Sequence, residues 1–162
     1  MKDSKAEPWT FRMRETMRGV HRFESGGSAS AALPFDFTLD WGPAPEWGTF
    51  RRGLVMDAVG ELRAEGLCER ADCRGQLVLD YWGAAELRYD LSFEQDGQRY
   101  RYLGRKVNIR PWNLPMSHTT CTGLILDADA RLVSTTLSHF RFRDLASFVG
   151  SFRVLRSASL AA

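Results

Sequence analysis

Apolar and polar residues alternate along most of this chain with a period of two. Such alternation is typical of β-strands with one buried face, because successive side chains of a strand point to opposite sides. The pattern predicts a first strand over Trp9–Phe23 and a second over Leu33–Trp41. Their apolar faces carry Trp9, Phe11, Met13 and Met17, and then Phe35, Phe37, Leu39 and Trp41.

The clearest element is a β-hairpin within Glu86–Ile109. Its turn is Asp96-Gly97, a pair typical of the type I′ turn, in which both central residues need positive φ. Folding the chain at this turn places one apolar and one polar face across the two strands. The predicted cross-strand pairs on the apolar face are Phe93 with Tyr100, Leu91 with Tyr102, Tyr89 with Gly104 and Leu87 with Lys106.

Four more strands follow from the same pattern. They are expected at Leu54–Leu62, Gly75–Trp82, Ser117–Leu126 and Leu132–Phe142. A helix over Asp57–Ala64 is the alternative for the first of them. After Asp144, apolar residues recur at intervals of three and four, which predicts an amphipathic helix of about ten residues.

About eight meandering antiparallel strands followed by one helix predict an all-β, closed, up-and-down barrel, because closure removes the exposed edges of a long sheet. An open β-sandwich is the alternative architecture. The length of 162 residues fits a single domain, residues 1–162.

Composition restricts the class of protein. With 44% hydrophobic and 26% charged residues the chain is expected to be globular, and a net charge of +2 gives no indication of a nucleic-acid partner. No apolar run is long enough for a membrane span, and the N-terminal residues lack a signal peptide's apolar core, so a cytoplasmic location is expected. The odd number of cysteines predicts free thiols, and Cys68 and Cys73, near an expected turn, lack further ligands for a metal site.

Several short motifs resemble a lipocalin-like (calycin-like) barrel domain found beside or fused to bacterial GMC oxidoreductases of the cholesterol-oxidase type. They are the hairpin run from Leu87 to Lys106, the early Glu15-x-Met17-x-Gly19, the Thr119-Thr120 pair, and the segment from Phe142 to Val154, which resembles the closing helix of that domain. The resemblance implies a barrel and an apolar ligand. Because the chain has no GxGxxG motif, flavin chemistry is not implied.

Two charged residues fall on predicted apolar faces. Lys106 is in register with Leu87, and Glu15 is in phase with Met13 and Met17. A lysine inside a barrel is costly unless it is paired, so Lys106 is either a rim residue that reaches water or an anchor inside a cavity. Strand parity suggests that Glu15 and Lys106 pair with each other.

Tyrosines on the hairpin's apolar face suit a pocket for a flat apolar ligand with one polar end, and they equally suit an ordinary core. The predicted ligand-binding residues are therefore Tyr89, Tyr100, Tyr102, Lys106 and Glu15. His118 and Cys121 are three apart on one strand and so point to opposite faces, which argues against a catalytic dyad. His21 and His139 are isolated, and no catalytic residue, metal or cofactor is predicted.

The function expected from the sequence is binding of a hydrophobic or amphipathic small molecule, lipid-like or steroid-like, in the barrel without chemical change. One alternative is an accessory module that docks on an oxidoreductase or on a second copy of the chain. Another is a small barrel enzyme that uses Glu15 or Lys106 as acid or base.

Overall fold

The computed structural model describes residues 9–24, 31–42, 53–80, 82–109, 119–140, 150–151 and 153–156. Its strands are β1 Trp9–Phe23, β2 Leu33–Trp41, β3 Leu54–Ala64, β4 Cys68–Asp80, β5 Glu86–Gln95, β6 Gln98–Val107, β7 Thr120–Leu126, β8 Leu132–His139 and β9 Arg153–Arg156. The alternating pattern therefore located the strands well, and the helix alternative for residues 57–64 is wrong.

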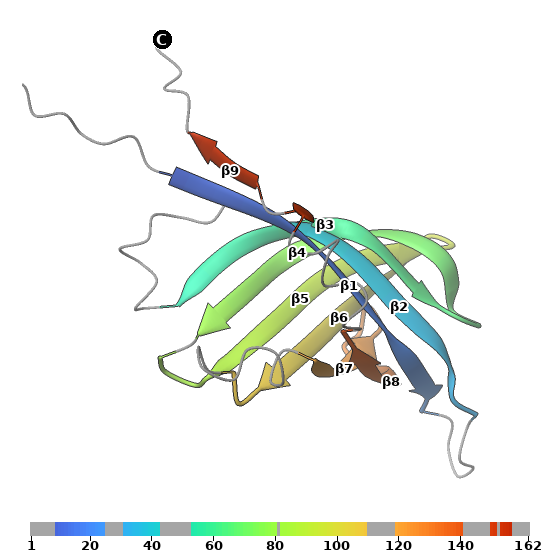
Figure 1. The fold of residues 1–162 in the computed structure, drawn as a ribbon. Coiled ribbons are helices and arrows are strands. Elements are labelled where there is room, and N and C mark those ends of the chain that lie inside the picture. The colour runs from blue at the N-terminus through green and yellow to red at the C-terminus, as the bar shows by residue number, and fades with distance from the viewer. Residues whose placement is uncertain are drawn as a thin grey trace, which may run out of the picture.

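Strands β1 to β8 form a closed antiparallel barrel (Figure 1). Each strand pairs with the next along the chain, and β1 closes the ring by pairing with both β2 and β8. The predicted barrel is thus confirmed and the open sandwich is wrong. Strand β9 pairs with the first residues of β1, where β1 extends beyond the ring (Figure 1).

The strands are staggered around the barrel. Following paired residues from Met13 through all eight strands leads back to β1 at Phe23, ten residues further along. Stagger of this kind tilts the strands relative to the barrel axis, and an eight-stranded barrel is wide enough to be filled by side chains or to hold one small ligand.

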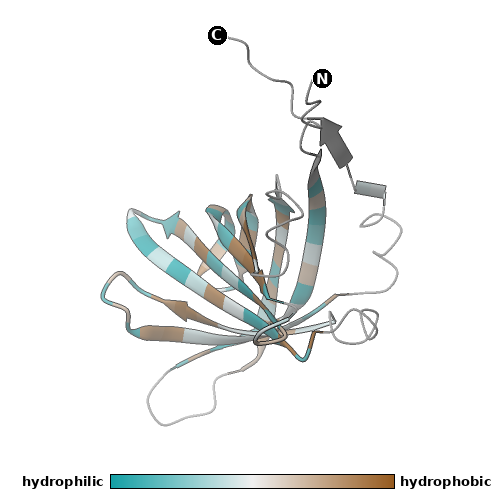
Figure 2. Cartoon of the chain, turned by 90° about the vertical axis from the view of Figure 1, so that its left-hand side faces the viewer, coloured by the Kyte–Doolittle hydropathy of each residue, from teal (hydrophilic) through white to brown (hydrophobic). Residues whose placement is uncertain are grey.

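Hydrophobic and hydrophilic residues alternate in bands along the strands (Figure 2). The inward side chains include four aromatic rings, Phe35, Phe37, Tyr89 and Tyr102, each at most 1% exposed. The rings of Tyr89 and Tyr102 lie 5.4 and 5.6 Å from that of Phe37. This cluster forms the centre of the core, where close packing of large rings excludes water.

A pair of glycines makes room for one of these rings. Gly104 of β6 lies opposite Gly123 of β7, and the ring of Tyr102 lies over both. A Cβ added at Gly104 would be 2.6 Å from the hydroxyl oxygen of Tyr102, and one at Gly123 would be 2.6 Å from its Cε2 atom. Glycine is therefore required at these positions by the close approach of the ring.

Some boundaries differ from the sequence expectation. Strand β4 begins at Cys68 instead of Gly75, so Cys68, directly after the turn at residues 65–67, and Cys73 are both buried strand residues. Two successive exposed residues, Glu69 and Arg70, interrupt the alternation here and hid the start of the strand. Strand β8 ends at His139, three residues before its predicted end at Phe142.

The predicted C-terminal helix lies largely outside the described residues. Of that stretch, Gly150 and Ser151 are helical, whereas Arg153–Arg156 form β9. The closing helix implied by the family resemblance, which ran to Val154, is therefore wrong at its end. The reason is that Arg153 and Val154 pair with Arg12 and Phe11 of β1.

The glycine pair yields the first prediction. Gly104→Ala is expected to lower the free energy of unfolding by about 2 kcal/mol, because the new Cβ displaces the Tyr102 ring in a filled core. Chemical denaturation measures it. Gly150→Ala is the matched control, since a Cβ there meets nothing within 4 Å and the residue does not have positive φ. In a Tyr102→Leu background the cost of Gly104→Ala should shrink, and an unchanged cost would contradict the contact.

Candidate functional site

A buried ion pair lies inside the barrel. The ammonium of Lys106 on β6 donates a hydrogen bond to Oε1 of Glu15 on β1, and the two residues are 0% and 5% exposed. The hydroxyl of Tyr89 on β5 donates to the other carboxylate oxygen, Oε2, over 2.6 Å. The Lys106 ammonium also lies over the Tyr89 ring, 5.5 Å from its centroid. We call these three residues the polar centre.

Each member of the polar centre constrains the others. Burial raises the pKa of Tyr89 well above its usual value, and the nearby Glu15 carboxylate raises it further. Tyr89 therefore stays protonated and acts as a hydrogen-bond donor. The centre thus combines one positive charge, one negative charge and one neutral donor.

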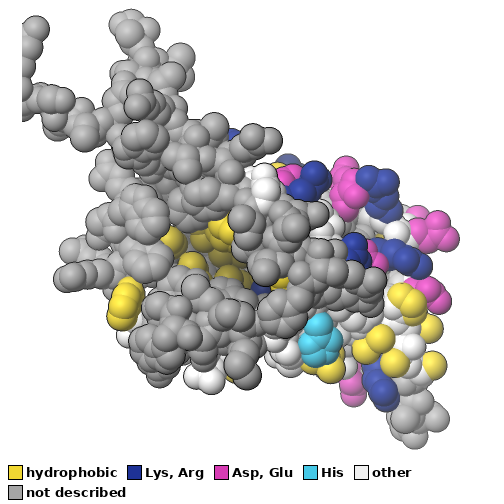
Figure 3. Space-filling view, viewed as in Figure 1, with side chains coloured by type: hydrophobic (Ala, Val, Ile, Leu, Met, Phe, Trp, Pro, Cys, Tyr) yellow, Lys and Arg dark blue, Asp and Glu magenta, His cyan; other side chains and the backbone are white. Residues whose placement is uncertain are grey.

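The polar centre is located towards one end of the barrel. Lys106 pairs with Leu87 near the start of β5, and Leu87 pairs in turn with Leu79 near the end of β4. Trp41 and Leu79, which belong to this end, keep 7% and 6% exposure, whereas the central aromatic rings keep 1% or less. Hydrophobic side chains are visible near the centre of the face shown in Figure 3.

The structure brings together three of the five predicted site residues. The pairing of Glu15 with Lys106, expected from strand parity, is confirmed, and Tyr89 joins it. The interpretation of Lys106 as a rim residue that reaches water is wrong, because its side chain is 0% exposed.

The other two predicted residues lie elsewhere. Tyr102 is fully buried in the aromatic cluster, with its hydroxyl 3.5 Å from Sγ of Cys121. Tyr100 is half-buried at the hairpin turn, where it stacks on Phe93 with centroids 5.4 Å apart and donates to Gln98. Tyr100 is thus at the opposite end of β6 from Lys106. His118 lies outside the described residues.

Sequence reasoning missed a row of hydroxyl side chains on the inner face of β8. Ser134 and Ser138 are fully buried and Thr136 is 6% exposed. Among the described residues, the Ser138 hydroxyl has no hydrogen-bond partner. The signal was present as serine and threonine at every second position, but such residues are also common in ordinary strands.

The row begins at a buried histidine near the other end of the barrel. His21 is 1% exposed, its Nε2–H donates to the carbonyl oxygen of Glu65 over 3.0 Å, and its Nδ1 accepts from the Ser134 hydroxyl over 2.8 Å. A carbonyl oxygen only accepts, which assigns the proton to Nε2. Burial lowers the pKa of His21, with smaller opposing effects from the Glu65 backbone and charge.

Several kinds of site are absent from the described part of the chain. It contains no group of three or more His, Cys, Asp or Glu side chains that could hold a metal ion. Cys68, Cys73 and Cys121 are free and buried, and burial raises the pKa of each thiol, that of Cys73 to about 12. In the described residues, no helix is long and apolar enough to cross a bilayer.

Searches of protein-family models, curated proteins and solved structures found no match to this chain. The resemblance to a lipocalin-like domain associated with GMC oxidoreductases therefore stays a prediction.

The polar centre yields a double-mutant cycle. Lys106→Met or Glu15→Gln alone should each cost about 3–5 kcal/mol of unfolding free energy, because each leaves a buried charge without its partner. The combined variant should lose far less unfolding free energy than the two single variants added together. The difference corresponds to a coupling energy of about 2–3 kcal/mol between the two side chains. The exposed pair Asp90 and Arg101 is the control, with an expected coupling below about 1 kcal/mol. Additive losses at Glu15 and Lys106 would contradict a coupled pair.

His21 should make stability depend on pH. Because its folded-state pKa lies below the unfolded value of about 6.5, only the unfolded chain binds the proton as the pH falls through that value. The free energy of unfolding is therefore expected to be highest above about pH 6.5 and to fall by at most about 1.4 kcal/mol per pH unit below it. Denaturation at several pH values measures this. His21→Gln should flatten the slope and His139→Gln, at an exposed position, should not. An equal slope in the His21 variant would refute the assignment.

Proposed function

We propose that the barrel binds a small hydrophobic or amphipathic molecule, lipid-like or steroid-like, and does not alter it chemically. The ligand would enter at the barrel end that is lined by Trp41 and Leu79. Its polar group would reach the polar centre of Glu15, Tyr89 and Lys106. The observation that carries this proposal is the buried ion pair at an end of the barrel where the other inward side chains are hydrophobic.

The energetics of the pair support a role in binding. Removing two charges from water costs several kcal/mol per ion, and their attraction returns this only with good geometry and further hydrogen bonds. Well-packed hydrophobic residues of similar volume would stabilise the barrel as well or better. The pair is therefore poorly explained by stability and better explained by a polar group that it recognises.

The donors of the centre define the ligand's polar group. An ammonium carries three N–H donors, and within the described residues the carboxylate of Glu15 accepts one of them. A hydroxyl, carbonyl or carboxylate oxygen of a ligand is a suitable acceptor for another. Both Glu15 oxygens already accept hydrogen bonds, from Lys106 and Tyr89, so the carboxylate is held in place.

The apolar surroundings define the ligand's body. Inward side chains at this end include Leu54, Leu79, Leu87 and Met56, all hydrophobic and at most 6% exposed. Deeper in the barrel, the rings of Phe35, Phe37 and Tyr102 already fill the space. A bound molecule would therefore occupy the Lys106 end, with its apolar part against leucine and methionine side chains.

A fluorescent fatty acid, 12-(9-anthroyloxy)stearate, tests the proposal. The protein should bind it with micromolar or better affinity, and the combined Glu15→Gln/Lys106→Met variant should bind at least about tenfold more weakly, because a charge-assisted hydrogen bond is lost. Using the combined variant avoids an unpaired buried charge. Arg99→Met, on the exposed face of the same strand, is the control and should leave the affinity unchanged. Equal binding by the combined variant, or no binding by the wild type, would refute the site.

A further inference from the structure

The outer wall of the barrel carries a groove on the opposite side of the sheet from the buried side chains of Glu15 and Lys106. It has a volume of about 760 Å³ and crosses strands β4 to β8. Its walls are outward-facing residues, among them Val78, Arg88, Leu103, Arg105, Thr122 and Leu124. This volume lies within the range of small-molecule sites, about 300–1,000 Å³.

The floor of the groove is the glycine pair described above. Gly104 and Gly123 line it together with Tyr89 and Thr136. Because the two glycines have no side chains, the Tyr102 ring packs directly against the inner side of the sheet there. The groove lies on the outer side of the sheet at the same place. The groove is thus formed by the rigid wall of the barrel and not by a loop.

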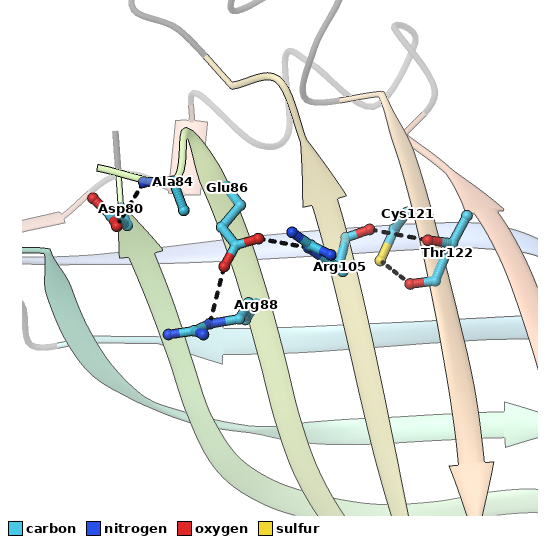
Figure 4. A network of polar contacts seen from close by, with 7 residues as sticks. All are labelled: Asp80, Ala84, Glu86, Arg88, Arg105, Cys121 and Thr122. Atoms are coloured by element: carbon cyan, nitrogen blue, oxygen red, sulfur yellow. Dashed lines mark hydrogen bonds and ion pairs between the residues drawn. The ribbon is translucent and has the colours of Figure 1, made fainter. Parts of the chain in front are cut away.

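Two arginines are held at one side of the groove by a buried carboxylate. Arg88 and Arg105 are directly opposite each other on β5 and β6, where like charges would repel. The Glu86 side chain, 7% exposed, lies between them (Figure 4) and accepts from Nε of Arg105 over 2.5 Å, while its other oxygen is 3.5 Å from Nε of Arg88. The side chains of Arg88 and Arg105 remain 57% and 60% exposed, so a ligand can reach both.

The charge balance of the groove selects the ligand. Asp90, which lines the groove, is neutralised by two hydrogen bonds from Arg101 at 2.7 and 2.6 Å, which lower its pKa. Arg88, Arg105 and Glu86 together carry one net positive charge. That charge matches a monoanion, and a planar carboxylate fits the geometry of guanidinium donors.

The apolar part of the groove is next to the arginines. Leu103 lies opposite Leu124 across β6 and β7, and Leu124 is 41% exposed. Val78 of β4 lies opposite Arg88 on the other side. Leu103 and Leu124 together offer a surface for an apolar ring or short chain on the far side of the arginines from Val78.

We propose that this groove is a second binding site, for a small organic carboxylate with an apolar body. The carboxylate would accept hydrogen bonds from Arg88 and Arg105, and the body would lie over Leu103, Leu124 and the glycine floor. Of the three polar-centre residues only Tyr89 also lines the groove. The arginines and leucines of the groove face outward, whereas Glu15 and Lys106 are buried inside the barrel. The second site therefore does not depend on the proposed function of the barrel interior.

Titration of the labelled protein with 1-naphthoate, followed by amide chemical shifts in NMR spectra, tests the proposal. We expect saturable shifts at Arg88, Gly104, Arg105 and Gly123. The uncharged 1-naphthamide, of the same shape, should bind at least about tenfold more weakly, since charge-assisted hydrogen bonds contribute about 1.5–3 kcal/mol.

Matched variants identify the side chains responsible. Arg88→Gln and Arg105→Gln should each weaken naphthoate binding by about tenfold or more, whereas Arg99→Gln, at an exposed position outside the groove, should not. Equal binding of naphthoate and naphthamide would overturn the proposal, and so would equal losses in all three variants. Shifts confined to inward residues around Lys106, or no shifts at millimolar naphthoate, would also overturn it. The Glu15→Gln/Lys106→Met variant should bind naphthoate normally, which separates this result from that of the interior site.

Discussion

The structure depends on the double pairing of strand β1. This strand forms hydrogen-bonded ladders with β2 on one side and β8 on the other, and these two ladders close the barrel. Closure turns a meander of local hairpins into a ring in which β1 and β6 face each other across the interior. Glu15 and Lys106, 91 residues apart in the chain, meet for that reason. Without closure each would be an isolated charge on an apolar face.

The interior of the barrel is divided along its axis. Aromatic rings fill the middle. Near the far end, His21 forms a hydrogen bond with Ser134, the first residue of the hydroxyl row on β8. The polar centre lies at the end whose leucines and tryptophan retain some exposure. The filled middle leaves only the charged end for the ligand that we propose.

The two faces of the barrel wall are linked through one ring. Tyr102 packs inside against Phe35 and Phe37, and it fits only because Gly104 and Gly123 carry no side chains. The same two glycines form the floor of the outer groove. The packing of the core thus shapes an outer surface on which Glu86 holds two arginines side by side.

The sequence by itself determined the strands and the hairpin register, because alternation and the Asp-Gly turn are local properties. All four predicted cross-strand pairs of the hairpin, including Leu87 with Lys106, are present. It also determined that Glu15 and Lys106 are in phase with apolar residues. Only the tertiary structure decided that Lys106 is buried and that Tyr89 completes the polar centre while Tyr100 lies apart. It also decided that Arg88 and Arg105 share the carboxylate of Glu86. These facts depend on the stagger and closure of the barrel, which set how residues of distant strands meet and which no short stretch of sequence encodes.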